Sequence, residues 1–390
     1  MPARKVAVLT GTRAEYGLLR PLLIELLNRP TLDIGLLVTG THLSPEYGNT
    51  VEEIERDGFP IWARVDALLE SDAPSAICKS MAMICIGMSD ALAAQKPDIL
   101  IGLGDRYELL ATVEAAMIHR VPIAHIHGGE ATEGLIDEAI RHAVTKMAHL
   151  HFVATEAYGE RVIRMGESPG RVFVSGALGL DNIAGLEPLS REELSASLGI
   201  ALPDSRLLFL VTYHPITLAE RSPGAAVGEM LTALEKFDEA TFIMTYPNAD
   251  TLGRSILEPM QRFVAARPDR AVFVESLGVR RYLSAMKLAD AVVGNSSSGI
   301  IEAPSFGVPT VNVGVRQAGR ICADSVLSCE EDAAAIARAI RDSQTATFRQ
   351  TARHCVNPYG DGKAAPRIAD HIADHPLDGI LMKSFYDGQA

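Results

Sequence analysis

Cationic residues, aromatic residues and cysteines are all scarce in this chain of 390 residues. Its 36 lysines and arginines against 49 aspartates and glutamates give a formal net charge of −13, whereas a nucleic-acid groove needs clustered cations. Aromatic residues make up only 5% of the chain, and Trp62 is the single tryptophan, so aliphatic side chains must fill the core. The five cysteines are an odd number without a C-x-x-C pair, which favours neither a disulfide framework nor a zinc ribbon.

Long hydrophobic runs are also lacking. No uninterrupted apolar stretch reaches the roughly 18 residues that a membrane-spanning helix requires, and we expect a strand directly after the first five residues. Cys78 and Cys85 lie in a Met-rich helical segment, 76–88, whose apolar stripe belongs either to the core or to an interface, and we favour the core. We therefore expect a soluble, cytoplasmic protein that binds neither a membrane nor nucleic acid.

Short apolar runs alternate with segments of helical period, such as 107–119 and 137–147. The runs predict strands at 6–10, 34–40, 99–104, 121–127, 150–154 and 172–176, and again at 207–212, 240–246, 271–275, 291–294 and 310–314. This rhythm predicts two Rossmann-like α/β domains that face a cleft, each with a doubly wound parallel sheet. A Gly- and Pro-bearing passage near 178–190 places the first domain at 1–182 and the second at 183–365, with a helix over 366–390 returning to the first.

Ligands of open α/β sheets bind beyond the carboxyl ends of the strands, so the residues that follow the strands are the candidates. In the second domain the stretch GNSSSG (294–299) joins a strand to a helix, where backbone N–H groups and the hydroxyls of Ser296 and Ser297 suit a phosphate. Glu302 lies one turn later and suits a neutral donor such as a ribose diol. The alternative is that the serines only cap the helix and Glu302 faces solvent.

Two charged residues follow strands of the first domain. Arg13 is placed to bind a diphosphate and to stabilise charge on a departing nucleotide, unless it forms a structural ion pair with Glu15 or a neighbouring acid. Asp105, in the stretch GDRYE (104–108), must either cap the next helix or face the ligand.

The stretch HIHGGE (125–130) adds a second group of candidates. The strand period of two predicts that His125 and His127 lie on the same side, but their spacing fits no helix-borne zinc pattern, and we expect no metal. Glu130 is a candidate acid or base beside a Gly pair that lets substrate approach the backbone.

Four polar residues open the next helix, at Asp137, Glu138, Arg141 and His142. Asp137 and Arg141 share one face, and Glu138 and His142 share another, so each pair is either an ordinary i,i+4 ion pair or part of a site. Carboxylates gathered at one sheet edge are what proton transfer on two faces of a sugar requires.

In the second domain, YHP (213–215) and YPN (246–248) follow the first two strands. His214 and Asn248 are placed to donate hydrogen bonds to a phosphate or a sugar hydroxyl. A histidine at a strand end is also commonly a structural donor.

Together these stretches resemble a known family. GTRAEYG (11–17), GDRYE (104–108), HIHGGEATEGLIDEAIRH (125–142), VTYHP (211–215), YPN (246–248) and GNSSSGIIE (294–302), in this order and with Arg316 and Gln317 after them, are similar to the UDP-N-acetylglucosamine 2-epimerase family. The GDRYE form is similar to its hydrolysing branch, and the resemblance covers most of the chain.

The resemblance implies a fold like that of B-type glycosyltransferases, with UDP bound mainly by the second domain. It implies elimination of UDP across C1 and C2 of a UDP-2-acetamido sugar, then hydration of the 2-acetamidoglycal to the free 2-epimer, without a metal or other cofactor. It assigns catalysis to Asp105, Glu130, Asp137 and His214. It assigns substrate binding to Arg13, Arg106, His142, Asp181, Asn248, Ser296, Ser297, Glu302 and Arg316.

Two substrates are compatible with the resemblance. UDP-N-acetylglucosamine would give N-acetylmannosamine and is the one we favour, while UDP-N,N'-diacetylbacillosamine would give 2,4-diacetamido-2,4,6-trideoxymannose. Either product would feed a nonulosonic acid pathway, sialic or legionaminic. The resemblance also implies a homodimer or homotetramer. The alternatives are a non-hydrolysing 2-epimerase, a glycosyltransferase of the same architecture and a UDP-sugar sensor without turnover.

Overall fold

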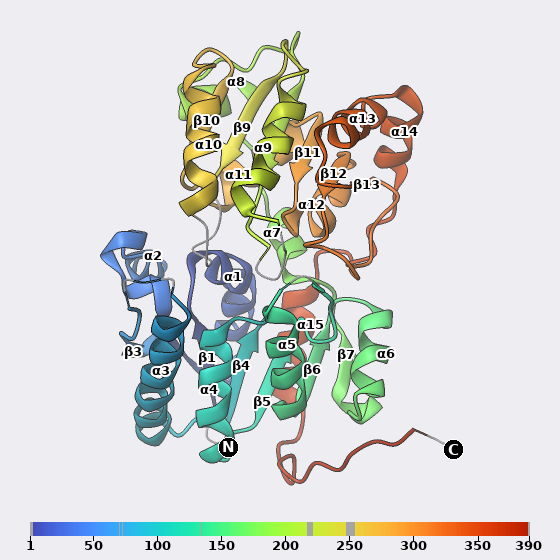
Figure 1. Cartoon of the computed structure of the whole chain (residues 1–390). Helices are drawn as coiled ribbons and strands as arrows, with labels where there is room; N and C mark the ends of the chain where they lie inside the picture. The colour runs from blue at the N-terminus through green and yellow to red at the C-terminus, as the bar shows by residue number, and fades with distance from the viewer. Residues whose placement is uncertain are drawn as a thin grey trace. The chain divides into compact units, whose positions relative to one another are not determined.

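The chain folds into two compact units, which we call unit 1 and unit 2. The computed structural model describes residues 3–69, 71, 73–133, 135–216, 221–246 and 254–388 (Figure 1). Unit 1 comprises residues 1–130, 137–182 and 359–390, and unit 2 comprises 131–136 and 183–358. Unit 1 therefore contains both ends of the chain.

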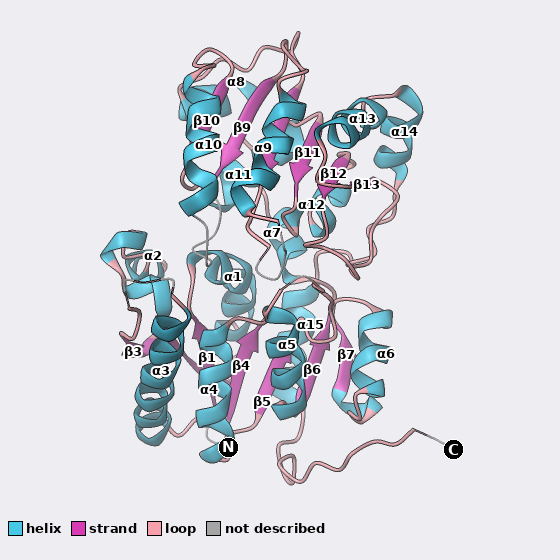
Figure 2. Cartoon of the chain, in the orientation of Figure 1, coloured by secondary structure: helices cyan, strands magenta, loops and turns pink. Residues whose placement is uncertain are grey.

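Unit 1 is built on a parallel sheet in the order β3-β2-β1-β4-β5-β6-β7 among the described residues (Figure 2). The chain order reverses between β1 and β4, as in a Rossmann sheet. The strands are β1 (Arg4–Thr10), β2 (Leu32–Thr39), β3 (Ile61–Val65), β4 (Ile99–Leu103), β5 (Ile123–Ile126), β6 (Leu150–Val153) and β7 (Val172–Val174). The helices are α1 (Arg13–Leu27), α2 (Val51–Arg56), α3 (Pro74–Gln95), α4 (Tyr107–Ile118), α5 (Asp137–Met147), α6 (Glu156–Arg164) and α15 (Ala364–Asp374), with α7 (Asp181–Ala184) at the boundary to unit 2.

Alternate residues of β1 serve two different cores. Val6 and Val8 pack with side chains of α1 and α15, while Ala7 and Leu9 pack with those of α3 and α4. Successive side chains of a strand point to opposite faces, so a fully apolar strand implies that both faces are covered. The helices of unit 1 accordingly cover both faces of its sheet.

Unit 2 repeats this plan with a parallel sheet in the order β10-β9-β8-β11-β12-β13 in the part that the structure describes. Its strands are β8 (Leu208–Thr212), β9 (Thr241–Thr245), β10 (Ala271–Val274), β11 (Ala291–Gly294), β12 (Thr310–Val313) and β13 (Val326–Cys329). Its helices are α8 (Arg191–Leu198), α9 (Pro223–Leu234), α10 (Arg254–Ala265), α11 (Gly278–Leu288), α12 (Ser298–Ile301), α13 (Ala333–Ser343) and α14 (Ala346–His354). Phe209 and Val211 pack with α9, α10 and α13, and Leu208 and Leu210 pack with α8 and α11.

The predicted fold class, two Rossmann-like α/β domains with parallel sheets, is confirmed. Two strands, β3 and β13, were not predicted, because most of their side chains keep exposed surface and their sequences contain Arg64 and Ser328 among the apolar residues. The helix predicted over 366–390 is observed over Ala364–Asp374, where it packs against α1.

Helix α3 bears on two expectations. With 22 residues, it is the one described helix that is long and apolar enough to cross a membrane, although the sequence shows no uninterrupted apolar run. The helix packs against α4 and β3 of its own unit. The Met-rich segment is only partly core, because Met88 is buried whereas Met83 and Ile86 are exposed.

Candidate functional site

Several of the candidate residues lie at the point of each sheet where the strand order reverses. In unit 1 this point lies between β1 and β4, which lead directly into Arg13 and Asp105. In unit 2 it lies between β8 and β11, which lead into His214 and Asn295. Open α/β sheets bind ligands at such points, beyond the carboxyl ends of the strands.

Arg141 is the centre of the polar cluster in unit 1. Its side chain, on α5, is 1% exposed and forms ion pairs with Asp105 and with Glu138, the latter at 2.6 Å between Nη1 and Glu138 Oε2. The same Nη1 donates to the carbonyl oxygen of Glu130 at 3.1 Å. Burial lowers the pKa of Arg141, but the carboxylates of Asp105, Glu130 and Glu138 outweigh burial and raise it overall. One buried cation therefore organises three of the acidic residues.

Asp105 does not cap the helix that follows it. The N-cap of α4 is Arg106, and no side-chain hydrogen bond caps this helix. Arg106 lies beside Glu108, with 3.1 Å between Nε and Oε2, and the Glu108 side chain is 2% exposed. Within unit 1, Asp105 therefore pairs with Arg141 instead of capping a helix. The buried carboxylate of Glu108 holds Arg106 in place.

His125 and His127 have different surroundings, which corrects the prediction that they share one side of a strand. Strand β5 ends at Ile126, and His127 has a left-handed φ of 66°, so the strand period does not reach it. The fully buried His125 donates from Nε2 to the carbonyl oxygen of Gly104 at 2.7 Å, with Nδ1 3.1 Å from Thr145 Oγ1. Burial lowers the pKa of His125 to about 3, so its ring is neutral.

Glu130 is the most buried of the candidate acids, at 1% exposure. Its Oε1 lies 2.8 Å from His127 Nδ1, and the His127 Nε2 accepts a long hydrogen bond of 3.4 Å from the N–H of Leu178. The carboxylate therefore has a histidine on one side, while the Glu130 backbone carbonyl is bonded to Arg141. A carboxylate in such a dry, polar environment is suited to acid or base chemistry.

Asp137 and Glu138 form the first turn of α5, where the helix dipole favours negative charge. Glu138 lies between two partners, since its Oε1 is 3.0 Å from His142 Nε2 and its Oε2 is bonded to Arg141. The expected i,i+4 pair of Glu138 and His142 is thus present. Asp137, the first residue of α5, is partly exposed.

Arg13 and Asp181 have structural partners in unit 1. Arg13 Nε lies 3.2 Å from Glu53 Oε2, so its neighbouring acid is Glu53, and both side chains are about two-fifths exposed. Glu15 accepts instead from the N–H of Gly11 at 2.7 Å, and burial raises the pKa of Glu15 to about 8. The two carboxylate oxygens of Asp181 accept from the first N–H groups of α15, at 3.0 and 2.9 Å. The structure therefore gives Asp181 the geometry of a helix cap.

His214 in unit 2 is held through its backbone. The side chain of Asn295 accepts from the His214 N–H at 2.7 Å and donates to the His214 carbonyl at 2.8 Å. Asn295 is fully buried, and His214 is 5% exposed. Gly294, which precedes Asn295, has a φ of 136°, and a Cβ on this residue would lie 1.9 Å from the carbonyl oxygen of Thr212. Glycine is required at this point because the end of β11 approaches that of β8 so closely.

The serine stretch forms a hydroxyl network at the end of β11. Ser296 Oγ and Ser298 Oγ are 3.0 Å apart, and Ser298 Oγ also bonds the hydroxyl of Tyr282 from α11. Ser297 occupies the N-cap of α12 and makes no side-chain capping bond. Because α12 is only four residues long, it supplies a smaller dipole than a full helix would.

The remaining candidates of unit 2 lie near the same strand end, with one exception. Glu302 follows α12, and Arg316 donates from Nη1 to the carbonyl oxygen of Asn295 at 3.1 Å. Gln317 donates to the same carbonyl at 2.8 Å. Asn248 lies outside the described residues.

Three residues at these sites were not singled out by sequence reasoning. Arg141 was considered only as a partner in an i,i+4 pair, and Asn295 and Tyr282 not at all. The signal for Arg141 was its place among acids on α5, and the signal for Asn295 was its position directly after a strand. The sequence contains no signal for Tyr282, because its contact with Ser298 depends on how α11 packs. Within the described ranges, no group of three or more His, Cys, Asp and Glu side chains is placed to hold a metal ion.

Known proteins match this chain over nearly its whole length. The family model described as UDP-N-acetylglucosamine 2-epimerase matches residues 24–373. A Campylobacter jejuni protein named GDP/UDP-N,N'-diacetylbacillosamine 2-epimerase (hydrolyzing) is 38% identical over 388 residues, which are 99% of this chain and 100% of the relative. A Legionella pneumophila protein named UDP-N,N'-diacetylbacillosamine 2-epimerase (hydrolyzing) is 36% identical, covering 97% and 98%. Polysialic acid biosynthesis protein P7 of Escherichia coli is 38% identical, covering 98% and 97%.

The fold is also similar to a solved structure, the UDP-GlcNAc 2-epimerase from Neisseria meningitidis bound to UDP-GlcNAc. The TM-score is 0.82 at 18% identity, covering 94% of this chain and 99% of the other. The chain has two Rossmann-like units, each with a polar cluster where its strand order reverses. This architecture is the one found in enzymes with a fold like that of the B-type glycosyltransferases. Within this class, the chain belongs to the UDP-N-acetylglucosamine 2-epimerase family. The resemblance to the hydrolysing branch that the motifs predicted is confirmed.

Proposed function

We propose that this protein is a hydrolysing 2-epimerase that converts a UDP-2-acetamido sugar into UDP and the free 2-epimerised sugar. The observation that carries the proposal is the cluster of acids around the buried Arg141 at the carboxyl end of the unit 1 sheet. Full-length relatives named as hydrolysing 2-epimerases support it.

The chemistry needs a base, a leaving-group site and an acid. Removal of the C2 proton pushes electrons into a C1–C2 double bond as the bond from C1 to the UDP oxygen breaks. Water then adds its oxygen at C1, and a proton returns to C2 on the opposite face. Asp105, Glu130 and Asp137 are the acids we assign to these proton transfers, and Arg141 forms an ion pair with the first of them.

We assign UDP to unit 2. Hydroxyls and backbone N–H groups at 296–298 would contact its phosphates, and Glu302 would accept from the ribose. His214 and Arg316 both bond Asn295, His214 to its buried side-chain amide and Arg316 to its backbone carbonyl, so this one residue positions two of the assigned ligand groups. Arg13 and Arg106 from unit 1 are assigned to the diphosphate and sugar, and His142 to the sugar.

The names of the relatives change which substrate we put first. Two relatives at 38% and 36% identity are named for UDP-N,N'-diacetylbacillosamine, and we propose this sugar nucleotide ahead of UDP-N-acetylglucosamine. UDP-N-acetylglucosamine is the second candidate, because it is bound to the similar Neisseria structure and a 38% identical relative is named for polysialic acid biosynthesis. We further propose that the enzyme acts in the cytoplasm as a homo-oligomer.

The test is NMR in deuterated water with each sugar nucleotide in a separate tube. Free UDP together with a 2-epimerised sugar that carries deuterium at C2 is the expected result, and the faster tube identifies the substrate. Accumulation of an epimerised UDP-sugar would contradict hydrolysis. The variant Glu130→Gln should bind UDP as the wild type does but release none from the substrate, and a variant that still turns over would remove Glu130 from the mechanism.

A further inference from the structure

The segment that follows α15, residues 375–388, is attached to unit 1, and we call it the tail. In Figure 1 it is the red trace that continues from α15. Ile380 of the tail is 3% exposed and belongs to the hydrophobic core of the sheet. Further along, the N–H of Tyr386 donates to the carbonyl oxygen of Gly166 at 2.9 Å. Lys383 lies between these two attachments, and its side chain is only 19% exposed.

Lys383 binds the carboxyl end of α5. Its ammonium group donates to the carbonyl oxygens of Lys146 and Ala148, at 2.7 Å each. Helix α5 ends at Met147, so these carbonyls belong to its last turn and to the residue that follows it. The last carbonyl groups of a helix have no partner within the helix, and the helix dipole makes them attractive to a cation. The tail therefore supplies the cation that caps α5.

A buried carboxylate fixes the direction of this ammonium group. Glu167 is 1% exposed, and its Oε2 lies 2.8 Å from Lys383 Nζ and 3.0 Å from His151 Nε2. Burial raises the pKa of Glu167, but the bonds from His151, Lys146 and Lys383 lower it overall to about 2, so the carboxylate is ionised at neutral pH. An ammonium group has three N–H donors. Lys383 uses them on one carboxylate and two carbonyls, and it cannot turn without losing a bond.

The opposite end of α5 carries the candidate acids. Asp137 is its first residue, and Arg141, one turn later, forms the ion pair with Asp105. With 11 residues at about 1.5 Å each, α5 is about 16 Å long and moves as one rigid rod. The carbonyl groups at its end point along the helix axis, so a donor held there resists a shift of α5 along that axis.

We propose that Lys383 is a positioning residue for the reaction, because it fixes α5 along its axis and thereby sets the positions of Asp137 and Asp105. This inference rests on the proposed function. A displacement of reacting groups by about 1 Å can cost about a hundredfold in rate. Hydration should suffer in a second way, because a 2-acetamidoglycal that is not protonated promptly at C2 can leave the enzyme.

A purely structural tail is the alternative. Ile380 fills the core three residues before Lys383, and it would stabilise unit 1 without help from the ammonium group. Such a role predicts fewer folded molecules but the same fate for each intermediate. The amount of free 2-acetamidoglycal per UDP released distinguishes the two roles, because this ratio does not depend on how much of the enzyme is folded.

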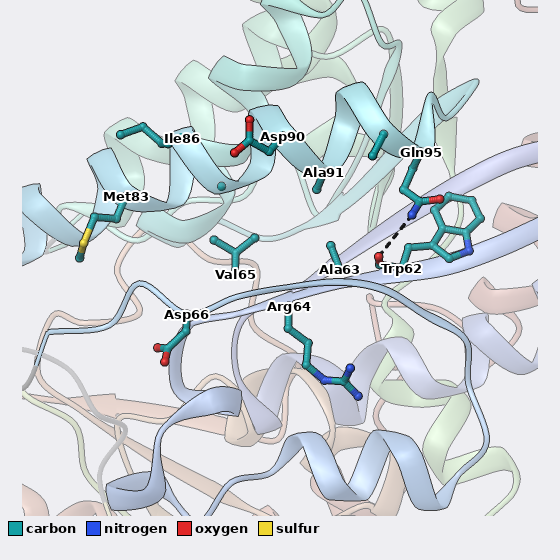
Figure 3. A pocket seen from close by; sticks show the side chains of 12 residues that line it. Trp62, Ala63, Arg64, Val65, Asp66, Met83, Ile86, Asp90, Ala91 and Gln95 are labelled. Carbon is teal, nitrogen blue, oxygen red and sulfur yellow. Dashed lines mark hydrogen bonds between the residues drawn. The ribbon is translucent and has the colours of Figure 1, made fainter.

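Helix α3 provides a matched control. Lys5 Nζ donates to the carbonyl oxygen of Gln95, the last residue of α3, as Lys383 does at the end of α5. Figure 3 shows this Gln95, with its side-chain amide bonded to the carbonyl oxygen of Trp62 at 3.3 Å. Helix α3 carries none of the residues that we assign to catalysis or binding. Lys5→Met therefore removes the same kind of bond from a helix without an assigned acid.

The test uses the full chain and counts UDP, the 2-epimerised sugar and free 2-acetamidoglycal by NMR. Lys383→Met should lower kcat about tenfold or more and raise the ratio of glycal to UDP about threefold or more, with KM within about twofold of wild type because UDP is assigned to unit 2. Lys5→Met should keep the wild-type kcat and ratio, even if its unfolding midpoint falls. A wild-type ratio in Lys383→Met, or an equal rise in Lys5→Met, would overturn the proposal.

Lys383→Gln replaces Lys383→Met in this test if the methionine variant does not fold. Glutamine keeps N–H donors but loses the charge and the reach of lysine, so the ratio should still rise about twofold. An active Lys383→Gln variant with the wild-type ratio would count against a positioning role. Failure of the proposed function looks different, because wild type itself would then release no UDP, and the inference would fail with it.

Discussion

Arg141 of α5 and Asp105 at the end of β4 form an ion pair in which the guanidinium is almost wholly buried. The pair joins two segments that are distant in sequence, and it places a fixed positive charge beneath the acids of the candidate site. Glu138 and the carbonyl of Glu130 complete the surroundings of Arg141. The positions of these acids therefore depend on one side chain that the sequence motifs did not single out.

Replacing Arg141 by methionine should impair both folding and turnover. The change leaves Asp105 and Glu138 without their buried cation, and breaking a buried ion pair costs about 3–5 kcal/mol. Urea unfolding should show this loss, and turnover of the sugar nucleotide should fall by about a hundredfold or more as the acids lose their alignment.

Arg164→Met provides the control for this variant, because Arg164 is an exposed arginine near the end of α6. It should leave both the unfolding midpoint and turnover near wild-type values. If Arg141→Met retained wild-type turnover, the cluster would be structural alone.

Replacing Asn295 by alanine should weaken UDP binding. The side-chain amide makes two hydrogen bonds to the backbone of His214, whereas Arg316 and Gln317 donate to the backbone carbonyl of Asn295, which alanine retains. Unsatisfied buried groups cost about 1–3 kcal/mol, and the loop that carries His214 would lose its anchor. Calorimetric titration with UDP should show a weaker Kd.

Asn182→Ala is a suitable comparison, since Asn182 in unit 1 donates a single hydrogen bond to the carbonyl of Gly17 at 2.9 Å. It should reduce stability slightly without affecting UDP affinity. Equal UDP affinities in wild type and Asn295→Ala would contradict the assignment of UDP to this strand end.

Buried histidines predict a loss of stability in mild acid. Burial lowers the pKa of His125 from 6.5 to about 3, so the unfolded chain binds a proton between these pH values and the folded chain does not. The stability that His125 contributes is thus complete above pH 6.5 and is lost as the pH falls. At pH 5 the loss is about 2 kcal/mol from this residue alone.

Urea unfolding at pH 7 and pH 5 measures this effect. The difference between the two pH values should be smaller in His125→Gln than in wild type, and unchanged in His354→Gln, which alters an exposed histidine. An unchanged pH dependence in His125→Gln would show that its ring is not protonated on unfolding.

Substitution of Asp181 distinguishes a structural role of this residue from a role in substrate binding. Because its carboxylate accepts two N–H groups of α15, Asp181→Ala should cost about 0.5–2 kcal/mol of stability, as for other helix caps, and leave KM unchanged. Asp181→Asn should lose less. A raised KM in a folded Asp181→Ala variant would instead support the substrate-binding role that the sequence predicted.

Strand positions and the residues that follow them were largely predictable, because a buried parallel strand reads as an apolar run that ends in a functional stretch. Asp105, His214 and Ser296 were placed directly after strands in this way, and the structure confirms those positions. The partners of these residues were not predictable in the same way. Asn295 and Tyr282 act through contacts between elements, and such contacts depend on the packing of whole helices and strands rather than on local spacing.

The interpretation of 76–88 as core shows a second limit. An apolar stripe looks the same whether it faces a sheet or a partner, because its period depends only on the helix. Only the packing of α3 reveals that Met88 faces inward and Ile86 outward.

The return of the last segment to unit 1 has a consequence for the order of folding during synthesis. Ala365, Ile368 and Ile372 of α15 complete the core that Val6 and Val8 begin. A ribosome therefore releases every residue of unit 2 before unit 1 has all of its own. Unit 2 can therefore fold first, while one face of the unit 1 sheet is still without the helix that covers it. At this stage a chaperone or a premature stop codon would have its greatest effect.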